Sequence, residues 1–210
     1  MNQRGRLAPT PTGFLHVGHA YTFGIAAERS AGKLILRVED LDATRCNPQF
    51  TTAAIEDLRW LGLSWTEGPD DEGDHGPYLQ SQRSDFYLQA WQRLAQQKDI
   101  YPSPQSRRDL ETAALAPHVS DEGESVFPKN YRPNEWVVPE HPGRVPWRFR
   151  VPDGKTIQFV DKNFGLVQRV AGTDFGDFVV WRRDNLAAYE LAVVVDDHHM
   201  EIGEVVRGKD

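Results

Sequence analysis

Two histidines three residues apart, His16 and His19, follow a short segment rich in proline and glycine, Pro9 to Gly13. Residues with this spacing lie on one face of a helix, and imidazole nitrogens can donate hydrogen bonds to phosphate oxygens. Gly18, between the histidines, has no side chain, so a ligand can come close to the backbone there. Together these residues predict a phosphate-binding site, if a strand precedes them and a helix begins near His16.

The neighbouring sequence supplies both elements. Leu7-Ala8 is short and apolar, as expected of a strand, and the segment from Ala20 to Ala31 is rich in good helix formers. The prolines end the strand because they cannot donate to a sheet ladder, and Gly13 permits a tight turn. The first turn of the helix then offers free N–H groups and the positive end of the helix dipole, which favour phosphate. Without this context, the histidines would be better interpreted as two surface residues.

A second strand is predicted over Lys33 to Glu39, a mostly apolar run of the kind found in buried parallel strands. Gly32 is well placed to end the helix before it. Strand, helix and strand form a βαβ unit, which indicates a parallel sheet and an α/β fold. Ligands of such sheets bind beyond the carboxyl ends of the strands, where the segments Pro9–His19 and Glu39–Asp42 both fall.

Further along the chain, helices are predicted over Pro48 to Leu61, with Asn47 as the cap, and over Arg83 to Gln97. From Ile100 the pattern changes to prolines, turns and short β-like runs. We interpret residues 100–183 as an inserted α+β subdomain, and residues 1–99 and 184–210 as the parallel-sheet core. Within the insert, a helix is expected over Ser106 to Ala116, and strands over Trp147–Val151, Thr156–Val160, Leu166–Val170 and Asp177–Arg182.

The chain is expected to return to the main sheet with Tyr189 to Val195, an apolar run that is interpreted as a buried strand. Asp196-Asp197-His198-His199 would then lie at the carboxyl end of this strand. Val205-Val206-Arg207 is expected to form one more strand.

The composition is that of a soluble globular protein: 210 residues, 39% of them hydrophobic and 26% charged. No stretch is apolar enough to span a membrane, and the N-terminus does not have the pattern of a signal peptide. Cys46 is the only cysteine, so no internal disulfide forms and a cytoplasmic location is expected. The net charge of −7 argues against indiscriminate nucleic-acid binding but leaves room for local basic patches. Candidates are Arg107-Arg108, Arg144 with Arg148 and Arg150, and Arg182-Arg183.

Four further residues are predicted at the same edge of the sheet as the histidines: Arg6, Glu39, Tyr189 and Arg207. Each has a simple structural explanation when it is taken alone. Together they offer an arginine for a side-chain carboxylate and a carboxylate for an α-ammonium group, beside histidines for phosphate. The set therefore indicates binding of an amino acid together with a nucleoside triphosphate.

The motifs that carry these residues closely resemble the glutamyl-tRNA synthetase family of class I aminoacyl-tRNA synthetases. They are Arg6 to His19, Glu39 to Arg45, Tyr78 to Arg83 and Tyr189 to Asp197, and the last resembles above all the short glutamyl-Q tRNA(Asp) synthetase branch, as does Asp177 to Arg183. The resemblance implies a Rossmann-like catalytic core with an acceptor-type insert. It implies a glutamate site made by Arg6, Ala8, Thr10, Glu39, Tyr189 and Arg207, and an ATP site made by Pro9, His16, Gly18 and His19, with His16 and His19 as the catalytic pair.

The chemistry that the resemblance implies is ATP-dependent activation of glutamate, with Mg²⁺, followed by transfer to queuosine in the anticodon of tRNA(Asp). A cytoplasmic monomer with glutamate, ATP and tRNA as partners, and without a membrane partner, is expected. Two features depart from the family pattern. Ser103-Pro104-Gln105 and Phe127 to Arg132 stand where the branch has zinc-binding cysteines, so no zinc is expected, and packing of Phe127, Tyr131 and Trp136 should hold the insert instead. The family's lysine-containing loop, which contacts the ATP phosphates, does not appear before Asp210, and a truncated chain is the expected explanation.

Several alternatives stay open. The chain fits the catalytic-domain part of a glutamyl-tRNA synthetase that charges a tRNA 3′ end, or a related module that binds without catalysis. A different nucleotidyltransferase with the same histidine motif would leave Glu39, Tyr189 and Arg207 unexplained. A metallohydrolase built on Asp196 to His199 is disfavoured, because successive residues of a strand point to opposite faces.

Overall fold

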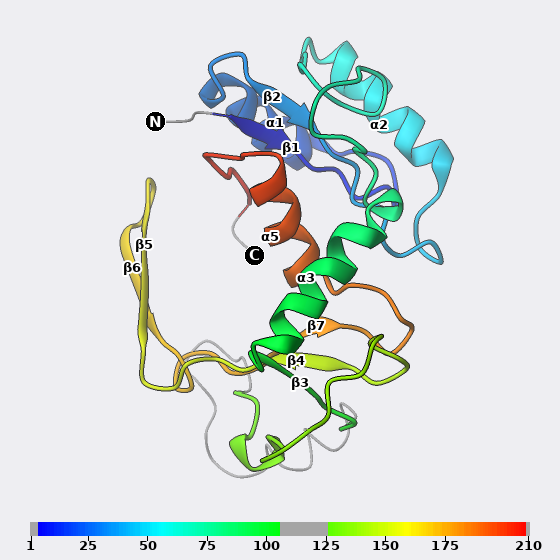
Figure 1. Cartoon of the computed structure of the whole chain (residues 1–210). Helices are drawn as coiled ribbons and strands as arrows, with labels where there is room; N and C mark the ends of the chain where they lie inside the picture. The colour runs from blue at the N-terminus through cyan, green and yellow to red at the C-terminus, as the bar shows by residue number, and fades with distance from the viewer. Residues whose placement is uncertain (1–3, 106–125, 209–210) are drawn as a thin grey trace. The chain divides into compact units, whose positions relative to one another are not determined.

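The structure, a computed structural model, describes residues 4–105 and 126–208, which fall into two compact units (Figure 1). The first unit comprises Met1–Tyr87 and Ala192–Asp210, and the second comprises Leu88–Leu191. The predicted insert, 100–183, lies within the second unit, and its boundaries stay a prediction. The helix expected over Ser106 to Ala116, and Arg107-Arg108 with it, lie outside the described residues. Within the described ranges, no helix has both the length and the apolar character that a membrane span requires.

The first unit is built on the predicted βαβ arrangement. Strand β1 (Gly5–Leu7), helix α1 (Val17–Arg29) and strand β2 (Leu34–Leu36) follow one another, and the two strands pair in parallel with Gly5 opposite Leu34. Every residue of both strands is buried. Gly32 has a positive φ of 80° just after the helix, which only glycine adopts without strain. The predicted α/β fold class is confirmed. The larger core cluster of this unit consists of Leu7, Phe23, Ala26, Leu34, Leu36, Leu58 and Trp65, and a smaller one of Ile35, Tyr78 and Met200.

Two single parallel bridges extend the sheet, one from Ile35 to Glu67 and one from Val38 to Leu79. Helix α2 (Pro48–Trp60) begins as predicted, because the Asn47 side chain accepts a hydrogen bond from the N–H of Gln49 at 3.0 Å. Helix α3 (Ser84–Gln96) also confirms its prediction. A short 3₁₀ helix, η1 (Gln80–Gln82), precedes α3.

The prediction of a strand over Tyr189 to Val195 is wrong. The segment belongs to helix α5 (Tyr189–His199), in which Ala192 and Asp196 are buried four residues apart, the spacing of a helix face, and Met200, directly after the helix, is buried as well. The run of valines favours a strand by intrinsic propensity, but a buried Asp196 requires polar partners, and in the helix it has them in Gln80 and Arg83.

The strand expected over Val205 to Arg207 is not formed either. This segment carries no strand hydrogen bonds; just before it, the N–H groups of Gly203 and Glu204 bond the carbonyl of Arg4. Val206 instead packs its side chain against the core around Leu7, so the apolar pattern reflects packing without sheet pairing.

The strands of the second unit pair in antiparallel fashion, as expected of an α+β insert. Strands β3 (Ile100–Pro102), β4 (Trp147–Phe149) and β7 (Phe178–Trp181) form a sheet in the order β3-β4-β7, and β5 (Thr156–Asp161) pairs with β6 (Gly165–Val170) as a separate hairpin. The short strands predicted here are confirmed, and a 3₁₀ helix, η2 (Lys129–Tyr131), lies between β3 and β4 in the chain.

Aromatic packing holds this unit together around Phe127. Its ring centroid lies 6.5 Å from that of Tyr101 and 6.1 Å from that of Tyr131, and Tyr101 lies 6.2 Å from Trp136. The predicted packing of these residues is confirmed. Asp177 is buried in the same region. It accepts hydrogen bonds from the hydroxyl of Tyr101, from the guanidinium of Arg132 and from the backbone N–H of Val151.

Candidate functional site

The start of α1 is arranged by its two histidines. His16 is the N-cap residue, and its Nδ1 accepts a hydrogen bond from the N–H of Gly18 at 3.1 Å. His19 Nδ1 accepts in turn from the N–H of His16 at 3.2 Å, so the two side chains form a reciprocal capping box. The ring centroids are 3.9 Å apart. Since each Nδ1 accepts, a neutral ring carries its proton on Nε2, where it remains available as a donor to a ligand.

The electrostatics of His19 favour this neutral form. Burial lowers the pKa of His19, and the nearby His16 lowers it further. A neutral imidazole still donates from Nε2, and the positive end of α1 adds to the attraction for an anion. The strand, turn and helix that a phosphate site requires are all present, and His16 is largely exposed.

Gly18→Ala is expected to separate folding from ligand binding at this helix start. A Cβ on Gly18 would lie 2.9 Å from His16 Cε1, so the ring of His16 must move, whereas alanine suits a helix better than glycine. We expect the thermal midpoint to change little, because the gain in helix propensity offsets the weakened cap at His16. ATP binding should weaken about tenfold, the order of one charge-assisted hydrogen bond. Calorimetric titration with ATP measures the second effect. Gly24→Ala, in the same helix with no atom within 4 Å of the new Cβ, is the control.

A second group of predicted site residues lies in β1 and just after β2, where Arg6 and Glu39 are both buried, with 7% and 8% of their surface exposed. Arg6 Nε lies 3.2 Å from Oδ1 of Asp197. The same oxygen accepts a hydrogen bond from Arg37 Nη1 at 2.7 Å, and Arg37 Nη2 donates to Oε1 of Glu39 at 3.0 Å. The chain Arg6–Asp197–Arg37–Glu39 therefore links the two predicted residues through alternating charges.

The neighbouring aspartate, Asp196, anchors this group in the protein interior. It is fully buried and accepts hydrogen bonds from Arg83 Nε at 2.6 Å, from Gln80 Nε2 at 2.7 Å and from the hydroxyl of Tyr87 at 2.9 Å. Arg37 Nε lies 3.8 Å from it. Burial raises the pKa of Tyr87, and the carboxylate of Asp196 raises it further. Both aspartates of α5 are thus engaged by arginines.

Opposing effects act on the ionisation of Glu39. Burial raises the pKa of Glu39, and the guanidinium of Arg37, followed by that of Arg6, lowers it again in part. Arg37 therefore favours the carboxylate form that an ammonium group would need as a partner.

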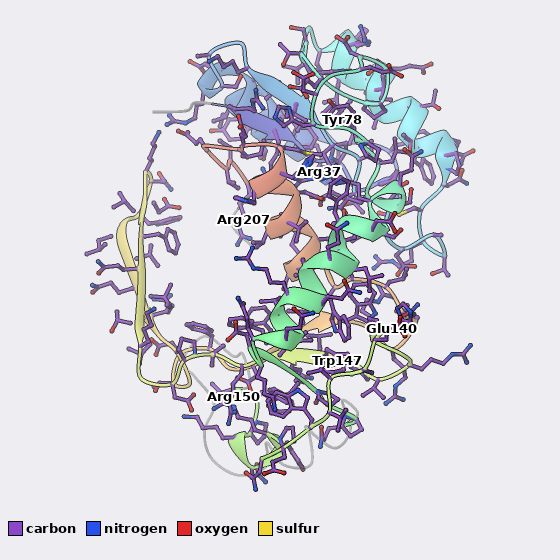
Figure 2. All side chains as sticks on the ribbon, viewed as in Figure 1. Arg37, Tyr78, Glu140, Trp147, Arg150 and Arg207 are labelled. Atoms are coloured by element: carbon purple, nitrogen blue, oxygen red, sulfur yellow. The ribbon has the colours of Figure 1, made fainter. Side chains whose placement is uncertain are left out.

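The backbone of the predicted binding segment is tied to this cluster. The N–H of Glu39 donates to the carbonyl of Pro9 at 2.9 Å, so the turn before α1 is fixed to the end of β2. Ala8 is half-buried and Thr10 exposed beside it. Arg207, labelled in Figure 2, is exposed. It directly follows Val206, whose carbonyl lies 3.5 Å from Arg6 Nη1. Tyr189 begins α5 in the second unit, and its membership of this site stays a prediction.

Sequence reasoning missed one member of the cluster, Arg37. The signal was present, since Arg37 is a charged residue within the buried run Leu34 to Val38, where a side chain needs ionic partners to be stable. Figure 2 labels it close to the parallel strands.

A separate basic cavity lies in the second unit. It is open to solvent, has a volume of about 1060 Å³, and brings together three of the arginines predicted as candidates for basic patches. Arg182 there pairs with Asp184 at 2.5 Å. Arg148 has a different role, since its guanidinium lies 4.2 Å from the ring centroid of Phe127 and it donates to Asp177 O. The cavity is lined by His141, Gly143, Arg144, Arg182, Arg183, Asp184 and Asn185.

Among the residues that the structure describes, no group of three or more His, Cys, Asp and Glu side chains is placed to hold a metal ion. Asp196 to His199, the set of the metallohydrolase alternative, lies on one helix with both aspartates engaged by arginines.

A parallel βαβ unit whose helix start is open to phosphate is typical of nucleotide-binding α/β proteins. Residues 3–210 match the family model of class I tRNA synthetases (E and Q), catalytic domain, and the chain belongs to this family.

Similar proteins of known name fall into two groups, glutamyl-Q tRNA(Asp) synthetases and glutamate–tRNA ligases. The chain is 44% identical to glutamyl-Q tRNA(Asp) synthetase of Nitratidesulfovibrio vulgaris and 46% identical to that of Symbiobacterium thermophilum, over 99% and 98% of its own length and 65% of theirs. It is 38% identical to glutamate–tRNA ligase of Lactobacillus johnsonii, over 99% of its own length and 44% of the relative's.

The fold resembles that of a glutamate tRNA ligase from Elizabethkingia meningosepticum, crystallised in complex with its amino acid. The TM-score is 0.74 at 27% identity, over 98% of this chain and 43% of that one. The chain thus spans about two thirds of the first relatives and less than half of this structure.

Proposed function

We propose that the chain carries out glutamate activation: it binds glutamate and ATP and forms glutamyl-adenylate and pyrophosphate. The observation that carries this proposal is the linked pair of Arg6 and Glu39, two buried and opposite charges in the unit that also holds His16 and His19. An arginine and a carboxylate suit the side-chain carboxylate and the α-ammonium group of an acidic amino acid. Histidine N–H groups at a helix start suit the triphosphate.

In the proposed reaction, the α-carboxylate oxygen of glutamate attacks the α-phosphorus of ATP, and the bond from that phosphorus to pyrophosphate breaks. Arg6 holds the side-chain carboxylate and Glu39 the ammonium group, so the reacting carboxylate is positioned. His16 and His19 donate from Nε2 to phosphate oxygens as charge develops on them. Ala8, Pro9, Thr10 and Gly18 border the substrates, Tyr189 and Arg207 complete the glutamate site, and Mg²⁺ accompanying ATP neutralises part of the phosphate charge.

For the acceptor we propose tRNA(Asp), with glutamate passing to queuosine in its anticodon. The higher identity to the glutamyl-Q tRNA(Asp) synthetases, 44% and 46% against 38% for a glutamate–tRNA ligase, supports this choice. Transfer to a tRNA 3′ end is the alternative, which the second group of relatives favours. The three arginines of the basic cavity in the second unit offer contacts for an RNA backbone in either case. We further propose a monomer located in the cytoplasm.

Glutamate-dependent exchange of pyrophosphate into ATP tests the first step, and it is run with and without tRNA. We expect exchange with glutamate, and about 10²-fold less in Arg6→Ala, because the γ-carboxylate then lacks its charged partner. Arg45→Ala, at an exposed arginine, is the control. Binding of glutamate without exchange under either condition would instead support a module that binds without catalysis, and absence of both would refute the proposal. Nuclease digestion after the transfer of labelled glutamate distinguishes the two acceptors, because the label is then recovered either on queuosine or on the 3′-terminal adenosine.

A further inference from the structure

In the chain Arg6–Asp197–Arg37–Glu39, Arg37 is the arginine that hydrogen-bonds both carboxylates. None of its surface is exposed, and its two terminal nitrogens are divided between Asp197, at 2.7 Å, and Glu39, at 3.0 Å. Asp197 in turn lies 3.2 Å from Arg6. A planar guanidinium has a fixed angle and distance between these two nitrogens, so it sets the spacing of the groups that it bridges.

We propose that Arg37 is a positioning residue that fixes the separation of Arg6 and Glu39, and that this separation selects an amino acid by the length of its acidic side chain. The inference rests on the proposed function, in which Arg6 binds the side-chain carboxylate and Glu39 binds the ammonium group. The number of methylenes that fits between these two charges is then set by a rigid bridge that touches neither end of the substrate.

The charges of the cluster support this role. Glu39 faces Arg37 and Arg6 and senses the negative charge of Asp197, and Arg37 contributes the largest of the attractive effects on it. Two guanidinium groups and two carboxylates alternate along the chain, so each inner group has an oppositely charged neighbour on either side. Removal of the bridge takes away this attraction, and Arg6 and Glu39 are no longer held at one distance.

The substitution Arg37→Lys tests whether the geometry of Arg37 matters apart from its charge. Arg37→Lys keeps a positive charge but presents one nitrogen in place of a rigid fork, so it cannot hold Asp197 and Glu39 at a defined spacing. The probes are L-glutamate and L-aspartate, which differ by one methylene, and their dissociation constants are measured by isothermal titration calorimetry on the whole chain. This equilibrium measurement does not depend on catalysis.

We expect the unsubstituted protein to prefer glutamate to aspartate by at least tenfold, and Arg37→Lys to reduce that ratio at least fivefold, chiefly through weaker glutamate binding. Arg83→Lys is the matched control. Arg83 is also fully buried and also contacts Asp196, but it reaches neither Asp197 nor Glu39 in the contacts that define the cluster. A loss of stability alone should therefore affect both variants similarly, whereas the ratio should change only in Arg37→Lys.

Asp197→Asn serves if Arg37→Lys does not fold, because Asp197 is partly exposed and asparagine keeps its shape. Its weakened link to Arg6 and Arg37 should also lower the glutamate-to-aspartate ratio. An unchanged ratio in a folded variant, or an equal change in Arg83→Lys, would overturn the positioning role while the proposed function stands. Absence of glutamate binding by the unsubstituted protein would overturn both.

Discussion

Asp196→Ala is expected to lower the free energy of unfolding of the first unit by about 3–5 kcal/mol, the range for breaking a buried ion pair. The carboxylate is fully buried and accepts from Arg83, Gln80 and Tyr87. Alanine leaves the guanidinium of Arg83, itself without exposed surface, with no neutralising carboxylate, and removes hydrogen bonds that water cannot replace there.

Urea unfolding followed by far-UV circular dichroism measures this loss, and Asp196→Asn indicates how much of it is due to charge. Glu56→Ala, at an exposed carboxylate of α2, should change stability by about 0.5 kcal/mol or less. A loss below about 1 kcal/mol for Asp196→Ala would mean that the buried arginines find other partners, and would contradict the anchoring role of α5.

His19→Ala is expected to have the largest effect on activity. It should reduce kcat/KM for ATP in glutamate-dependent pyrophosphate exchange by about 10²–10³, the cost of removing one donor to developing negative charge. The fold should survive, since alanine is a good helix former and His19 is only half-buried. His198→Ala, at an exposed histidine of α5, is the control and should retain the exchange rate.

The pH dependence of ATP binding gives a second readout for His19. Burial and His16 hold the pKa of His19 below the usual 6.5, so the ring of the free protein is neutral at pH 7. Triphosphate favours the protonated ring, which means that binding takes up a proton and affinity should increase as the pH falls below 6.5. His19→Ala should lack this part of the increase. An equal pH dependence in both proteins would show that His19 does not meet the phosphates.

The βαβ unit was predictable because its signals are local. The prolines after β1, the glycine after α1 and the cap at Asn47 each determine a boundary through the backbone of a few neighbouring residues. His16 and His19 could be placed for the same reason. Their mutual capping was not foreseen, because it depends on side-chain rotamers.

The sequence-based predictions were wrong or incomplete where contacts between distant parts of the chain determine the local structure. The apolar run of α5 favours a strand locally, but Asp196 is buried against side chains more than a hundred residues earlier in the chain. Arg37 was overlooked for a related reason: its partner Asp197 lies 160 residues later in the chain, and only the structure brings the two side chains together. The existence of a charged site could therefore be predicted, but not the residue that bridges it.

The ion-pair cluster also has a consequence for synthesis on the ribosome. Arg6, Arg37 and Arg83 emerge early, whereas Asp196 and Asp197 follow only after the roughly one hundred residues of Leu88–Leu191 have been translated. At usual elongation rates the nascent chain waits about 5–20 s for these carboxylates. During that interval Arg6 and Arg83 lack the carboxylates that they pair with in the folded unit, so we expect this part of the cluster to form only after α5 has left the exit tunnel.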